Sequence, residues 1–146
     1  MLHLSRTSQY AVRTLTFLAQ QPPAQYQLTR RIAEALDIPG PFLSKVLQPL
    51  VLRGLVDSQR GRSGGVRLAR SASEITMFEV VDALEHLRRP RECMLGQSDC
   101  TDERACPFHT EWKAAWHNRE EVLRRTTVED FKGFCDRAPE AGYPVR

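Results

Sequence analysis

The segment "VDSQRGRSGGVRLA", residues 56–69, constrains the fold of this chain more than any other. "VDSQ" and "GVRLA" are typical of short strands, and the three glycines of "RGRSGG" supply the positive φ angles that a tight hairpin turn requires. The turn carries Arg60 and Arg62, with Arg67 and Arg70 close behind. Taken alone, the hairpin also fits the less favoured alternative of a solvated basic turn.

Three helices are predicted before this hairpin. The first covers about residues 5–20 and stops at "QPPAQ", because proline cannot continue the hydrogen-bond ladder. "TRRIAEAL" predicts a second helix with Thr29 as its cap, and "PFLSKVLQPLVLRGL" predicts a third, with Pro41 at its first position and Gly54 at its end. Apolar residues recur at helical spacing in all three, namely Ala11, Leu15 and Leu18, then Ile32, Ala33 and Leu36, then Leu43, Val46, Leu47 and Leu50.

The order of these elements predicts a DNA-binding fold. Two short helices joined by "DIPG" form a helix-turn-helix, whose second helix usually enters the major groove, although spacing alone also fits an ordinary helical hairpin. A basic, glycine-tipped hairpin directly behind it has the position of a wing, which contacts phosphates or the minor groove. We therefore expect a mainly α fold with a small β-hairpin wing. The net charge of +3 permits DNA binding without arguing for it.

A fourth amphipathic helix is predicted over about residues 75–87, with Ser73 or Thr76 near its cap and "RRPRE" at its end. No apolar run approaches the roughly 18 to 20 residues that cross a bilayer. The N-terminal segment is interrupted by Arg6, Gln9 and Arg13, unlike a signal peptide. We therefore expect a cytoplasmic protein with no membrane partner, in which thiols stay reduced.

The polar loop "CMLGQSDCTDERACPFH" holds three of the four cysteines. Cys93, Cys100 and Cys106 are separated by six and five residues, and His109 follows after two. The loop offers too little apolar area to be ordered by packing. Pro107 predicts that a helix begins here, with Cys106 as its cap, and the positive end of a helix favours a thiolate. Thiolates select zinc or iron-sulfur iron.

Several interpretations of this loop compete. Disulfides are disfavoured in a reducing compartment, and a peroxide-sensing thiol pair is an alternative. A structural zinc site with three cysteines and a histidine remains open, but zinc sites usually bring cysteines in pairs two to four residues apart. The wider spacings favour an iron-sulfur cluster. A thiol oxidoreductase using Cys93 and Cys100 lacks a supporting Cys-x-x-C pair or nucleotide loop, so we expect no enzyme.

The helix after the loop carries a largely apolar stripe that also includes one arginine: Phe108, Trp112, Ala115 or Trp116, Arg119, and Val122 or Leu123. Two tryptophans on one exposed helix are costly unless a partner buries them, so the stripe predicts a homodimer interface. The alternative is a helix that folds back on its own domain.

The chain as a whole resembles the Rrf-type family of bacterial winged-helix transcription regulators, which includes IscR-like and NsrR-like iron-sulfur regulators. The resemblance extends from Leu4 to about Phe134 and depends on "LSRTSQYAVRTLTFLA", "IPGPFLSKVLQPLVLRGLV", "SQRGRSGGVRLAR", "ITMFEVVDALE" and the three-cysteine loop. It implies a homodimeric repressor or activator whose helix after the loop crosses to the partner subunit.

The resemblance also implies a cofactor. Its three cysteine ligands fall on Cys93, Cys100 and Cys106, and IscR-like members add a histidine at the position of His109 to hold a 2Fe-2S cluster. NsrR-like members use an acidic residue of the partner's first helix to hold a 4Fe-4S cluster, but here that position falls near Ser8 and Gln9. This favours 2Fe-2S, with 4Fe-4S as the alternative. The first cysteine spacing is one residue longer than in IscR-like members.

DNA contacts are expected from the third helix and the wing. Pro49 should bend the C-terminal half of that helix, so we assign base reading to its N-terminal half. The predicted contacts are Phe42, Ser44, Lys45, Gln48, Arg60 and Arg62. The site would be a near-palindromic operator in double-stranded DNA. The predicted division is a DNA-binding domain over 1–88, a cluster loop over 89–108, a dimerisation helix and turn over 109–134, and a flexible tail over 135–146.

Overall fold

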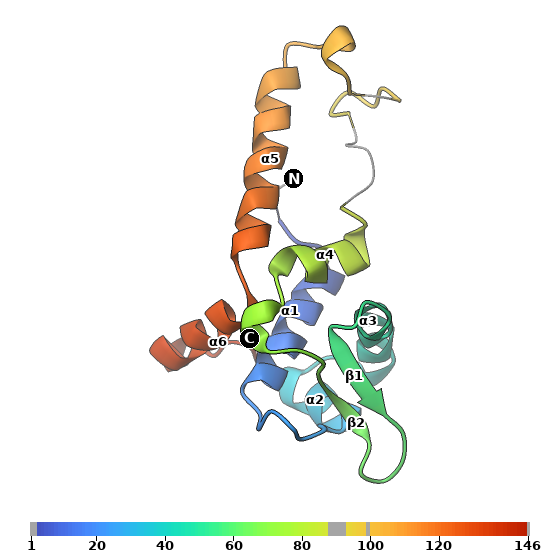
Figure 1. Ribbon diagram of the computed structural model, residues 1–146, viewed down its shortest axis with the longest axis vertical. Helices are drawn as coiled ribbons and strands as arrows, with labels where there is room; N and C mark the ends of the chain where they lie inside the picture. Colours follow the sequence, from blue (N-terminus) through green and yellow to red (C-terminus); the bar gives the residue numbers. More distant parts are fainter. Residues whose placement is uncertain (1–2, 88–92, 99, 146) are drawn as a thin grey trace.

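The computed structural model describes residues 3–87, 93–98 and 100–145, and shows a helical domain from which one long helix projects (Figure 1). The elements are α1 (Arg6–Ala19), α2 (Thr29–Leu36), α3 (Gly40–Leu52), β1 (Val56–Gln59), β2 (Gly65–Leu68), the 3-10 turn η1 (Ala72–Glu74), α4 (Met77–Glu85), η2 (Asp102–Arg104), α5 (His109–Arg125), α6 (Val128–Arg137) and η3 (Pro139–Ala141). The predicted mainly α fold with a two-stranded wing is confirmed. No helix among the described residues is long and apolar enough to span a membrane.

The core of the domain lies between α1, α2, α3 and α4, and the predicted apolar stripes build it. Leu15, Ile32, Leu36, Leu43 and Leu50 are fully buried side chains. The helical spacing therefore identified the inward faces correctly. α3 continues through Pro49 to Leu52 as one helix, and Arg53 closes it by donating its backbone N–H to the carbonyl of Pro49.

The wing is an antiparallel pair in which Val56 faces Leu68 and Gln59 faces Gly65. β2 is joined near the turn to the segment before α2, because Gln27 and Val66 exchange two backbone hydrogen bonds of 2.8 and 2.9 Å. Gly65 lies against Gln27 with φ +136°, a region that favours glycine. The glycine-rich turn is thus needed for this approach as well as for the hairpin.

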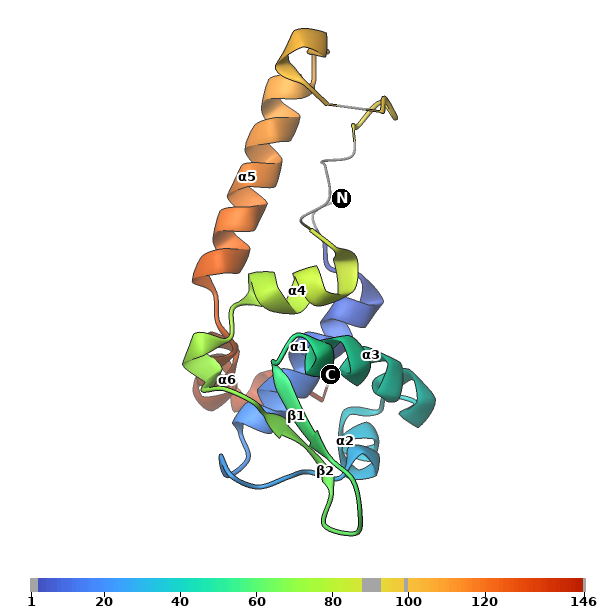
Figure 2. The same ribbon diagram turned by 45° about the vertical axis from the view of Figure 1, so that its right-hand side comes forward.

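α5 forms an arm that is attached at its C-terminal half and extends away from the domain (Figure 1; Figure 2). At its base, the guanidinium of Arg124 lies 3.6 Å from the ring centroid of Phe78 on α4. Arg119 also forms an ion pair of 3.3 Å with Glu85. The arm therefore folds back onto α4 only near its base, while its first turns lie beyond the domain.

The predicted helix caps need correction. Thr29 is the first residue of α2 and Leu28 occupies the cap, without a side-chain hydrogen bond. Of the two residues expected near the cap of α4, Thr76 occupies it, and its hydroxyl accepts from Glu79 N. The arm begins two residues later than Pro107 suggested, with Phe108 as its cap, so the cap position is not held by Cys106. A tight turn at Pro107 delays the helix, and the Cys106 carbonyl accepts from His109 N.

The C-terminal prediction also needs correction. The arm ends at Arg125, and a separate helix, α6, covers residues for which a turn and a flexible tail were expected. Tyr143 packs against Phe131 and Phe134 with ring centroids about 6 Å apart, and Arg13 donates to backbone carbonyls of the final residues. Aromatic packing and these hydrogen bonds hold the segment to the domain. The segment 88–92, predicted to end the fourth helix, lies outside the described residues.

Candidate DNA-binding surface and cysteine loop

The predicted base-reading residues share the outer face of α3. Ser44, Lys45 and Gln48 are exposed, while Leu43 and Val46 face the core. The Ser44 hydroxyl donates to the Gly40 carbonyl at 3.1 Å. Phe42 is 36 % exposed and meets the Tyr10 ring edge-on at 5.5 Å, so it is shared between the surface and the packing of α1.

The four arginines of the wing fall into two groups. Arg67 pairs with Asp57 at 3.3 Å and lies over the Tyr26 ring, and Arg70 pairs with Glu79 at 2.8 Å. Arg60 and Arg62, at the tip, are exposed and have no ion pair among residues 3–87, 93–98 and 100–145. The tip arginines are therefore the wing arginines without a carboxylate partner among the described residues, whereas Arg67 and Arg70 each have one.

The cysteine loop lies at the far end of the arm from the domain, whereas the wing turn lies at the opposite end of the molecule (Figure 1). Backbone N–H groups of Gln97 and Leu95 point at the Cys93 sulfur, and with Cys100 and Gly96 they lower the pKa of its thiol despite slight desolvation. The loop therefore favours a thiolate at Cys93, which is the form that binds metals.

His109 lies on the first turn of the arm and contacts both Cys100 and Asp102. Asp102 in turn binds Lys113, and the sequence pattern singled out neither of these two residues. Nδ1 of His109 lies 3.4 Å from Cys100 Sγ, and its Nε2 lies 2.7 Å from Asp102 Oδ1. Lys113, one helical turn along the arm, donates to both Asp102 oxygens at 2.9 and 3.1 Å. Lys113 and then His109 lower the pKa of Asp102, so this carboxyl stays ionised.

This arrangement orients the imidazole. An ionised carboxylate only accepts hydrogen bonds, so Nε2 carries the proton and donates to Asp102. Nδ1, the other ring nitrogen, faces Cys100 Sγ. Metal-bound histidines usually have such a carboxylate behind them. Two sequence features could have pointed to these residues: Asp102 is two residues after Cys100, and Lys113 is four residues after His109. Neither feature identifies a site until η2 places Asp102 beside the arm.

The donor atoms of the loop suit an iron-sulfur cluster in their chemistry. Cys93 contacts Cys100, which in turn contacts His109, and all three cysteines of the loop are free thiols of intermediate exposure. Within the described residues, however, no three His, Cys, Asp or Glu side chains are arranged as a metal-binding group. The chemistry of the donors Cys93, Cys100, Cys106 and His109 fits a cluster.

The stripe predicted on the arm is only partly covered. Phe108 is 51 % and Val122 38 % exposed, while Trp112 and Trp116 are half-buried and contact each other edge-on. The indole Nε1 of Trp116 is buried without a hydrogen-bond partner among the described residues. An apolar groove of about 390 Å³ runs beside the arm base, lined by residues such as Leu4, Met77 and Val122. These apolar surfaces remain available for a partner.

A family model and a relative both match this chain over most of its length. A family model described as Rrf2, iron-dependent transcriptional regulator, matches residues 4–132. Protein aau3 of Rhizobium meliloti is 38 % identical over 131 residues, which cover 89 % of this chain and 84 % of that protein.

Two solved structures extend the comparison. CymR, the global cysteine regulator of B. subtilis, superposes with a TM-score of 0.78 at 25 % identity, covering 92 % of this chain and 98 % of the other. IscR of T. potens superposes with a TM-score of 0.75 at 25 % identity, covering 93 % and 90 %.

Proposed function

Because this chain belongs to the Rrf2 family of transcriptional regulators, we propose that it is a DNA-binding regulator whose operator binding is switched by an iron-sulfur cluster. The favoured cluster is 2Fe-2S, bound by Cys93, Cys100, Cys106 and His109. The matched family consists of transcriptional regulators rather than enzymes. We place the protein in the cytoplasm, where it would sense iron-sulfur status, redox state or nitric oxide.

The observation that carries this proposal is a pair of contacts near the N-terminus of the arm, one between Cys93 and Cys100 and one between Cys100 and His109. One thiol has a lowered pKa, and the imidazole presents Nδ1 toward the second thiol while Asp102 holds Nε2. A bound cluster supplies a redox-active centre that exchanges an electron or is lost to a chemical signal. The chain's own residues hold it, and Asp102 and Lys113 keep the imidazole in orientation.

On the DNA side, Ser44, Lys45 and Gln48 are proposed to read base edges in the major groove, with Phe42 beside them for a thymine methyl. Their exposure on one face of α3 supports this assignment. A second copy of the chain, bound along the arm, would place two such faces on a near-palindromic operator with half-sites about one helical turn apart. The uncovered apolar groove and the stripe on the arm support the homodimer.

Anaerobic purification tests the cofactor directly. We expect a coloured protein with two iron and two sulfide ions per chain, and Mössbauer spectra that distinguish 2Fe-2S from 4Fe-4S. Colourless protein with one zinc per chain would contradict the switch and leave a zinc-stabilised repressor. Four iron and four sulfide ions would keep the switch but assign the 4Fe-4S alternative.

A thiol-based redox repressor is the second candidate. The contact between Cys93 and Cys100, with a lowered pKa at Cys93, favours it. Metal-free protein whose operator affinity changes when these two cysteines form a disulfide would support this function instead. Mass spectrometry of the tryptic peptides identifies that bond.

Replacing Arg60 with glutamine is expected to weaken binding to every DNA sequence alike. Arg60 is exposed on the wing turn, where its charge would displace counterions from phosphate. The slope of log Kobs against log salt should fall by about one. Titrations at four salt concentrations with operator and random DNA measure both effects. Arg30→Gln on α2 is the matched control, because Arg30 already pairs with Glu34. An unchanged slope for Arg60→Gln would contradict the wing assignment.

A further inference from the structure

We infer that α4 transmits the state of the cysteine loop to both DNA-reading elements, through the ion pairs Asp82–Arg53 to α3 and Glu79–Arg70 to the wing. This inference rests on the proposed function, since it describes how the proposed switch would act over distance. The loop and the wing turn lie at opposite ends of the molecule, and α4 lies between them in both views (Figure 1; Figure 2).

α4 has the connections that such a role requires. It follows the wing directly through η1, and its C-terminal end leads into the segment before Cys93. The arm rests on it through Arg124 over Phe78 and through the ion pair of Arg119 with Glu85. A displacement of the loop or of the arm therefore acts directly on α4.

Three acidic residues of α4, spaced every three positions, each bind a different neighbour. Glu79 binds Arg70 at the end of the wing, and Asp82 binds Arg53 at the end of α3. Glu85 accepts from Ser5 N and Ser8 Oγ at the start of α1, as well as from Arg119. Because these residues are three positions apart, their carboxylates lie along one side of the helix. The three contacts therefore move together when the helix moves.

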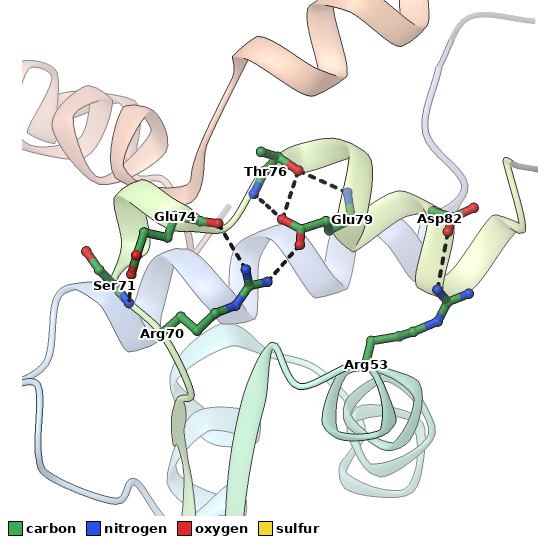
Figure 3. Close-up of polar contacts among 7 residues, drawn as sticks. All are labelled: Arg53, Arg70, Ser71, Glu74, Thr76, Glu79 and Asp82. Carbon is green, nitrogen blue, oxygen red and sulfur yellow. Dashed lines mark hydrogen bonds and ion pairs between the residues drawn. The ribbon is translucent and has the colours of Figure 1, made fainter.

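The contact with α3 is made by a buried carboxylate. Asp82 is 2 % exposed and lies 3.5 Å from a guanidinium nitrogen of Arg53, the residue that caps α3 (Figure 3). Burying a carboxylate is costly, and an apolar residue would often stabilise a core better. A charge kept here instead specifies one position of the α3 end relative to α4. That position determines how Ser44, Lys45 and Gln48 are presented.

The contact with the wing is built into the start of α4. Thr76 and Glu79 form a capping box, and Arg70 donates to the same Glu79 carboxylate at 2.8 Å and to the Glu74 carbonyl at 3.4 Å (Figure 3). Burial opposes ionisation of Glu79, but the hydrogen bonds from Thr76 and Arg70 outweigh it and lower its pKa. Rotation of α4 would therefore move Arg70, just after the wing, together with Arg53, at the end of α3.

The test measures how strongly the cluster state changes DNA affinity, in anaerobically purified full-length protein with and without chelator treatment. The coupling ratio is the operator Kd of one form divided by that of the other, and typical coupling makes it roughly 5- to 150-fold in the unmodified chain. We expect Arg53→Gln to bring this ratio at least about threefold closer to one, and Arg53→Gln with Arg70→Gln to bring it within about twofold of one. Iron and sulfide content should not change.

The ratio distinguishes a loss of coupling from a simple loss of affinity. If Arg53 only touched phosphate, its loss would weaken both forms equally and leave the ratio unchanged, which would overturn the inference. Arg53→Lys, which keeps the charge, should retain most of the ratio, and Arg30→Gln should retain all of it. Arg53 is 47 % exposed but its partner Asp82 is buried, so removing the guanidinium is expected to cost stability, and circular dichroism checks that Arg53→Gln is folded before its ratio is measured. Arg70→Gln alone, at a partly exposed ion pair, tests the wing contact while Asp82 keeps its partner. A ratio of one in the unmodified chain overturns the switch and this inference together, whereas a normal ratio that survives both substitutions overturns the inference alone.

Discussion

A variant carrying Cys93→Ala, Cys100→Ala and Cys106→Ala is expected to lack visible absorbance and to bind operator DNA with an affinity changed by roughly 5- to 150-fold. The three thiols supply every sulfur ligand proposed for the cluster, and His109 alone would not hold it. Absorption spectra with iron and sulfide assays measure the first effect. Fluorescence anisotropy with labelled operator, at one fixed salt concentration, measures the second.

Cys135→Ala is the matched control, because it removes the remaining cysteine from a different place. Cys135 is buried in α6, where desolvation and the neighbouring Asp136 raise the pKa of its thiol. That thiol is a poor metal ligand, so absorbance and DNA affinity should match the unmodified protein. If the triple variant bound DNA with the affinity and site preference of the metal-loaded protein, the switch would be wrong.

Gly65→Ala is expected to destabilise the whole domain. A Cβ at this position would lie 2.2 Å from the Gln27 carbonyl oxygen and 2.6 Å from its carbon, at φ +136°. Both atoms belong to backbone that cannot rotate away, so the bridge between Gln27 and Val66 has to open. Strain and lost hydrogen bonds together should cost about 3 to 5 kcal/mol of unfolding free energy, a large share of a typical domain's stability. Urea denaturation followed by circular dichroism measures this cost.

Gly61→Ala separates the strain caused by a positive φ from the strain caused by the close approach to the Gln27 backbone. Gly61 also has a positive φ, +106°, but an added Cβ would meet no atom within 4 Å. It should therefore cost only about 1 to 2 kcal/mol. Equal losses in the two variants would mean that the close approach to Gln27 contributes nothing.

Helix and strand identities were predictable because each depends on local residue order. Apolar residues at helical spacing placed α1, α2 and α3, and "VDSQ" matched β1 residue for residue. Cap residues were predicted less well. Ser73 and Thr76 are both chemically able to cap α4. Thr76 is the cap, and it also forms a bridge with Thr127, which is far away in sequence.

Some residues of the candidate site could likewise be predicted from the sequence, whereas others could not. Spacing alone singled out Cys93, Cys100, Cys106 and His109, because soft ligands crowded into one polar loop are typical of a site for a soft metal. Asp102 looked like any loop aspartate until η2 placed it against His109. Asp82 looked like an ordinary polar residue of an amphipathic helix, and its 2 % exposure could not be inferred from a helical pattern.

By itself, the sequence determined which faces of the helices are buried, where the hairpin turns and which atoms are available as metal ligands, since these depend on side-chain chemistry and short-range periodicity. Only the tertiary structure decided which arginines are free. Arg60 and Arg62 remain exposed at the tip, whereas Arg67 and Arg70 are held by carboxylates that the fold brings to them. The reason is physical: an ion pair forms between groups that the whole chain packs together, and one carboxylate, Glu79, comes from an element beyond the wing.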